Sequence, residues 1–94
     1  MDKTRSHPPE MEAYRITGPW LDLRGLSCPL PVLKARKALA GMPPGQRLGV
    51  ESDDPVAAID LPHFCAEAGH VLVAALRQAD GSIRFVIERG GAAA

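Results

Sequence analysis

The stretch LDLRGLSCPLPVLKARKALAG, residues 21–41, decides how this chain begins to fold. Residues 20–24 alternate weakly between apolar and polar side chains, which predicts a short strand. Gly25 then allows a sharp turn, because it has no Cβ. Beyond the turn, apolar side chains recur on one helical stripe up to Gly41. The stripe consists of Val32, Ala35, Leu39 and Met42.

The middle of the chain predicts a second strand and a second helix. Residues 47–52 alternate as a strand does, and Asp53-Asp54-Pro55 follows as an acidic helix start with proline at the first helical position. Pro62 lacks an N–H, so we expect it to separate a short first turn from a second helical piece over residues 61–68. Gly69 then ends the helix.

The last third predicts a hairpin. Residues 71–79 and 82–89 read as strands, and Asp80-Gly81 between them is a strong turn signal. Ile83, Phe85 and Ile87 share one face of the last strand. The order β-α-β-α-β-β predicts an α+β fold, a two-layer sandwich with two helices on one face of a four-stranded mixed sheet. Residues 20–91 form this domain, and the polar, proline-containing residues 1–19 are expected to be a flexible tail.

Composition argues against several classes of protein. The 94 residues suffice for one domain, and their formal net charge is zero. That balance, with 4 % aromatic residues, argues against direct DNA binding and against an RNA-stacking surface. Two cysteines are too few for a secreted disulfide framework, and no apolar run approaches the roughly 20 residues of a membrane helix. We therefore expect a cytoplasmic protein without a membrane partner.

Cys28 is the candidate reactive group. We place it at the cap of the first helix, with Pro29 at the first helical position and Pro31 at the third. The prolines leave the amides of Leu30 and Val32 free to donate to the sulfur, and a helix N-terminus lowers a thiol pKa. A buried structural cysteine is the alternative, because free cysteine is often buried. The two prolines favour the reactive interpretation.

Other features have a structural and a functional interpretation. Lys34, Arg36 and Lys37 form a basic face that either docks an acidic partner or is simply solvated. Cys65 is either a second reactive thiol or a core residue, and we favour the core. His63, Cys65 and His70 fit no metal motif, so we expect no metal.

Three segments carry a family resemblance. LDLRGLSCPLPVLKARKAL resembles the first signature of the TusA sulfur-carrier family, which is Cys-Pro-x-Pro after a Gly-Leu turn. DDPVAAIDLPHFCAEAGH is similar to the second helix segment of that family, and ADGSIRFVIERGG to its final hairpin. The resemblance covers residues 21–91.

The resemblance implies a sulfur carrier, which acts as a sulfurtransferase. Cys28 would accept sulfane sulfur as a persulfide from a cysteine desulfurase or a rhodanese-like donor and pass it to an acceptor protein, with no cofactor. The family serves tRNA thiolation, molybdenum-cofactor supply and sulfur oxidation. Ser27 and Leu30 depart from the basic and acidic residues of members that serve tRNA thiolation, which weakens that assignment.

Two other functions stay open from the sequence. An RNA-binding module is possible for this order of elements, and a thiol-based regulator would use Cys28 with or without Cys65. The absence of a CxxC motif argues against a redox pair. We expect a monomer, because a carrier must present the same thiol to two successive partners.

Overall fold

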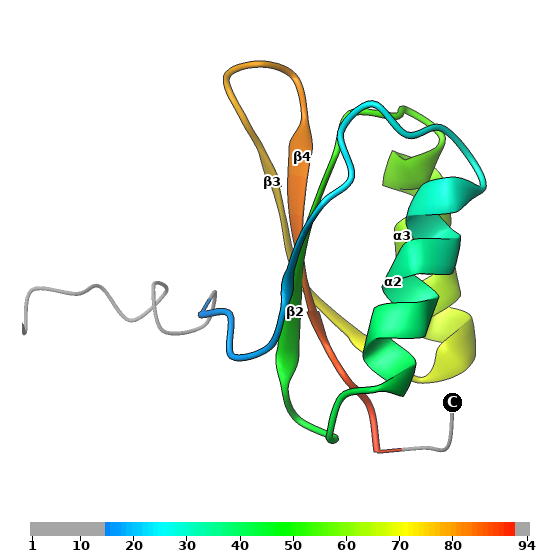
Figure 1. The fold of residues 1–94 in the computed structure, drawn as a ribbon, viewed down its shortest axis with the longest axis vertical. Helices are drawn as coiled ribbons and strands as arrows, with labels where there is room; N and C mark the ends of the chain where they lie inside the picture. Colours follow the sequence, from blue (N-terminus) through cyan, green and yellow to red (C-terminus); the bar gives the residue numbers. More distant parts are fainter. Residues whose placement is uncertain (1–14, 92–94) are drawn as a thin grey trace, which may run out of the picture.

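The fold, described for residues 15–91 in a computed structural model, has two layers (Figure 1). Helices α2 and α3 lie side by side on one face of a four-stranded sheet. In chain order the elements are β1 Trp20–Asp22, α2 Leu30–Ala40, β2 Arg47–Ser52, α3 Ala57–Ala68, β3 Val71–Arg77 and β4 Ile83–Glu88. The predicted α+β sandwich is confirmed.

The sheet is mixed, and its strand order is β1-β2-β4-β3. β1 and β2 are parallel, and β4 runs antiparallel to both of its neighbours. Because α2 follows β1 and α3 follows β2, both helices begin at the same edge of the sheet. This topology brings two loops, far apart in sequence, to one end of the molecule.

The core lies between the sheet and the helices. The predicted stripe of the first helix faces it, since Ala35, Leu39 and Met42 are buried and Val32 packs against them. The predicted face of the last strand faces it too, with Phe85 and Ile87 buried. Burial of each large apolar side chain stabilises the fold by roughly 1.5–3 kcal/mol. The core therefore fixes the position of both helices on the sheet.

Helix α3 runs unbroken through Pro62, so the predicted separation into two pieces is wrong. Proline removes one backbone hydrogen bond from the helix. The residues on the core side of α3, Ala57, Leu61 and Cys65, are all buried on one stripe. Their packing keeps the helix continuous across the missing bond.

Thr17 and Gly18 bind the first residue of β2. Gly18 donates its N–H to the Arg47 carbonyl at 2.7 Å, and the Arg47 N–H is 2.8 Å from Thr17 Oγ1. Most of the expected tail, residues 1–14, lies outside the described residues. Within residues 15–91 no helix has the length and apolar character needed to span a membrane.

Candidate functional site

Cys28 lies exposed in the loop that joins β1 to α2. Gly25 turns this loop with a φ of 87°, a left-handed conformation that favours glycine. The Gly25 N–H donates to Asp53 Oδ1 at 3.0 Å, and the Leu26 N–H donates to the Leu23 carbonyl at 3.2 Å. The loop is thus held at its first turn, both to itself and to the segment before α3.

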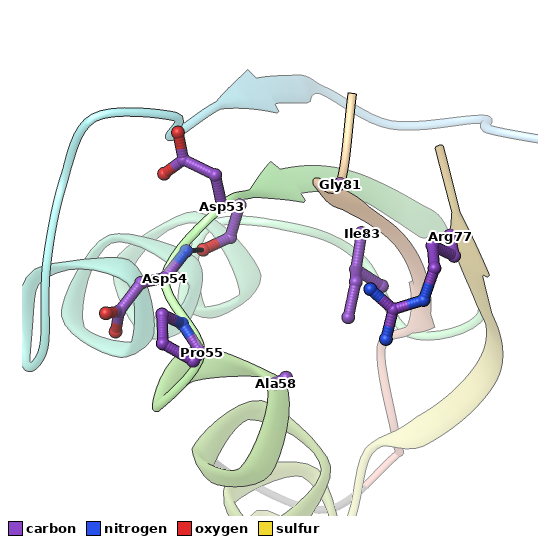
Figure 2. A pocket seen from close by; sticks show the side chains of 8 residues that line it. Asp53, Asp54, Pro55, Ala58, Arg77, Gly81 and Ile83 are labelled. Atoms are coloured by element: carbon purple, nitrogen blue, oxygen red, sulfur yellow. Dashed lines mark hydrogen bonds between the residues drawn. The ribbon is translucent and has the colours of Figure 1, made fainter. Parts of the chain in front are cut away.

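Asp54 holds the loop at the cysteine itself. Its Oδ2 accepts the N–H of Cys28 at 3.1 Å and the N–H of Ala57 at 3.1 Å. Figure 2 shows Asp54 on the segment that enters α3, with its carboxylate turned away from Arg77. The cap of α3 is Val56 and not the predicted acidic residue, yet Asp54 Oδ2 binds the N–H of Ala57, the first residue of the helix. The same oxygen ties the Cys28 backbone to the start of α3.

Helix α2 begins one residue later than predicted. Pro29 is its cap, so Cys28 precedes the cap and has no place in the helix. The Leu30 N–H donates to the Ser27 carbonyl at 3.0 Å, which leaves it unavailable to the sulfur. Among residues 15–91 no hydrogen bond joins the Val32 N–H to the sulfur either. The predicted hydrogen bonds from these two helix amides to the sulfur are therefore wrong.

The sulfur of Cys28 faces a carboxylate. Its Sγ–H donates to Asp60 Oδ2 at 3.5 Å. Partial loss of water raises the pKa of the Cys28 thiol above its ordinary value, and the hydrogen bond and charge of Asp60, with the charge of Asp54, raise it further. The predicted lowering of this pKa is wrong, because lost hydration and the two nearby carboxylates all favour the neutral thiol.

Asp60 is the site residue that the sequence did not reveal. It lies in the first turn of α3, where the helix dipole favours a negative charge, so the dipole explains its presence without any link to Cys28. The order of the elements could have indicated that Asp60 lies near Cys28, because two parallel strands, each followed by a helix, place both helix starts at one edge of the sheet. The order of the elements does not give the direction of the Asp60 side chain.

Apolar side chains are exposed where the two helices begin. Four large ones lie at the start of α2 or of α3: Leu30, Leu33, Val56 and Ile59. The predicted basic residues Lys34, Arg36 and Lys37 are all exposed along α2, and none of them forms an ion pair within residues 15–91. The end of the molecule that carries the thiol is therefore partly apolar, and the exposed cations follow along α2.

Comparison with known proteins identifies the family. The family model described as "Sulfurtransferase TusA" matches residues 20–89. This chain belongs to the TusA family. It also resembles the crystal structure of a SirA-like protein from Desulfitobacterium hafniense, with 29% identity and a TM-score of 0.70 over 77% of this chain and 97% of that chain. The predicted resemblance is confirmed, and family membership supports a sulfur-carrier role in general.

The second cysteine of this TusA-family chain is a core residue. Cys65 is 1 % exposed and packs in the core cluster with Leu61 and Phe85. Burial raises the pKa of its thiol to about 11. Both cysteines are free, and only Cys28 is exposed. The predicted core role of Cys65 is confirmed.

An open pocket lies between the start of α3 and the β3–β4 hairpin, next to the segment that binds the β1–α2 loop (Figure 2). Its lining residues are Ser52, Asp53, Asp54, Pro55, Ala58, Arg77, Gly81 and Ile83. No group of three histidine, cysteine, aspartate or glutamate side chains is arranged for a metal ion in the described part of the chain. His63 pairs with Glu67 instead, and His70 Nδ1 accepts the Gly90 N–H.

Proposed function

We propose that this TusA-family protein carries sulfane sulfur as a persulfide on Cys28 and delivers it to an acceptor protein. The observation that carries the proposal is the exposed thiol on a loop fastened at both Gly25 and Cys28. A carrier must offer one sulfur atom to two partners in turn. A fastened, exposed loop suits that task, because little ordering remains to be done when a partner docks.

Both steps are thiol–disulfide-type exchanges. In loading, the Cys28 thiolate attacks the outer sulfur of a donor persulfide, a new S–S bond forms, and the donor cysteine leaves as a thiolate. In delivery, an acceptor thiolate attacks the outer sulfur on Cys28, and Cys28 leaves as the thiolate. The donor is a cysteine desulfurase or a rhodanese-like protein, and neither step needs a metal or an organic cofactor.

The surface around Cys28 suits transient docking. The exposed Leu30 and Ile59 offer apolar contact at the starts of α2 and α3, and Lys34, Arg36 and Lys37 offer positive charge to an acidic partner. Pro29 and Pro31 restrict the backbone where α2 begins. We propose a cytoplasmic monomer as the form that meets both partners.

Three destinations are proposed for the sulfur, as in the family. They are molybdenum-cofactor supply, sulfur oxidation and tRNA thiolation, and Ser27 and Leu30 weigh against the last. The acceptor supplies the attacking thiol in each case, so the chemistry at Cys28 is the same.

Intact-protein mass spectrometry tests the proposal. Wild type, Cys28→Ser and Cys65→Ser are incubated without reductant with a cysteine desulfurase, pyridoxal phosphate and cysteine. A gain of about 32 Da, one sulfur atom, is expected on wild type and on Cys65→Ser but not on Cys28→Ser. Rhodanese with thiosulfate is the second donor. If neither donor loads Cys28, the carrier proposal fails.

A further inference from the structure

Asp60 presents its carboxylate to the reactive sulfur without a cationic side chain beside it in the described chain. Its Oδ2 lies 3.5 Å from Cys28 Sγ, and its side chain is half-buried. Within residues 15–91 no lysine, arginine or histidine pairs with this carboxylate. The thiol hydrogen of Cys28 is therefore the one hydrogen-bond donor that the described side chains offer to Asp60.

We infer that Asp60 is a positioning residue that holds the empty carrier as an oriented thiol, and that the reactive thiolate forms readily only when the charge of Asp60 is neutralised. The inference rests on the proposed function of Cys28 and adds a control on it. On ionisation the Sγ–H bond breaks, the proton goes to solvent, and the lone pair left on sulfur faces an ionised carboxylate. A cationic side chain of a docked partner removes that repulsion.

The same contact distinguishes the empty carrier from the loaded one. Once Cys28 bears a second sulfur, its Sγ has no hydrogen to donate, so the bond to Asp60 is lost. In delivery the negative charge returns to Sγ beside Asp60, which opposes departure until a cation is present. An unloaded thiol that stays protonated is also protected from oxidation, because oxidants attack the thiolate.

Other charged groups near the loop affect the Cys28 thiol less directly than Asp60 does. Asp54 adds to the repulsion through its charge, while Asp53 binds the Gly25 amide and does not contact the sulfur. On α2 the nearest cation in sequence is Lys34, which forms no ion pair in the described chain. Asp60 is the only one of these groups in contact with Sγ. Removal of its charge alone should therefore change the titration of Cys28.

The experiment is the pH profile of Cys28 alkylation by iodoacetamide, followed by intact mass on the full chain. In this reaction the thiolate forms the new C–S bond and displaces iodide. Asp60→Asn should move the midpoint of the profile to lower pH and speed alkylation at pH 7. If the midpoint falls by about 1 in pH, the rate should rise roughly threefold, because tenfold more thiolate is offset by its lower nucleophilicity.

Two variants serve as controls. Asp60→Glu keeps the charge and should restore a profile close to wild type. Asp53→Asn removes one charge from the same end of the molecule but keeps an oxygen for the Gly25 N–H, so its profile should stay near wild type. A midpoint in Asp60→Asn equal to that of wild type, with the same thermal unfolding temperature, would overturn the inference.

A salt series on the wild type needs no variant and tests whether carboxylate charge holds the thiol protonated if Asp60→Asn does not fold. Raising ionic strength from about 0.01 M to about 1 M shortens the Debye length from roughly 30 to 3 Å and should lower the wild-type midpoint. An unchanged midpoint contradicts the inference. Alkylation uses no sulfur donor, so failed loading in the mass experiment would contradict the carrier function while leaving this result readable.

Discussion

The two cysteines of the chain lie in opposite surroundings on neighbouring helices. Cys28 precedes α2, is exposed, and donates to a carboxylate, whereas Cys65 lies inside α3 among apolar core residues. The pKa of each thiol is raised, that of Cys65 by burial and that of Cys28 by lost hydration and carboxylate charge. A raised pKa therefore does not separate a functional cysteine from a structural one. Access to partners separates them.

The largest expected effect is a difference in alkylation rate between the two thiols. At pH 7 in native protein, Cys28 should react with iodoacetamide at least about 10³-fold faster than Cys65, because Cys65 must wait for an opening that costs several kcal/mol. Labelling followed by peptide mass spectrometry measures both sites in one sample. Similar rates at the two sites would mean that α3 opens freely.

The features that could be predicted from the sequence are those that depend on residues close together in the chain. The stripe through Leu39 and the face of Phe85 follow from short-range periodicity, and both were predicted correctly. The cap of α3 was predicted at the acidic pair before Pro55 but lies at Val56. The unbroken α3 was not predicted, because core packing of Leu61 overrides the local effect of Pro62. Propensity rules do not contain that tertiary contribution.

The surroundings of the Cys28 sulfur depend on a contact across 32 residues of sequence. Topology places the two helix starts together, but the turn of the Asp60 side chain toward the loop depends on how α3 is rotated on the sheet. The observed cap of α2 is Pro29, one residue after the predicted cap Cys28, and this difference changes which amides are free to bind the sulfur. Sequence rules place a helix boundary only to within one or two residues.

The second prediction concerns stability at alkaline pH. The folded pKa of Cys65, about 11, exceeds the ordinary value of 9.0, so the fold prefers the neutral thiol. Its stabilising contribution is complete below pH 9 and is lost as pH rises toward 11, by about 3 kcal/mol in all. Urea unfolding at pH 7 to 10.5 should show this decline, and Cys65→Ala should flatten it.

A matched variant separates the two thiols in that experiment. Cys28→Ser should keep most of the alkaline decline, because the exposed thiol is better hydrated than the buried one. The reverse pattern would be a free energy of unfolding that stays constant with pH in Cys28→Ser and still declines in Cys65→Ala. That result would mean that Cys28 causes most of the alkaline decline, and it would contradict the contrast between the two sites.

The smallest expected effect tests the link between the two regions. Asp54 Oδ2 accepts one N–H from the Cys28 loop and one from α3, so Asp54→Ala leaves both donors without this partner. Loss of a side-chain oxygen that accepts an N–H at the start of a helix costs about 0.5–2 kcal/mol in the free energy of unfolding, measured by urea titration. Asp54→Asn should lose less, because its amide oxygen still accepts both N–H groups.

The same two variants show whether the loop and the core open together. If the loop opens independently of the core, Asp54→Ala should increase hydrogen exchange of the Cys28 amide by more than the global loss of stability explains. The alkylation rate of Cys65 should then rise only by the factor that corresponds to that global loss. An equal rise at both sites would mean that Cys28 and Cys65 belong to one cooperative unit, and that the loop has no independent motion with which to adapt to a donor or an acceptor.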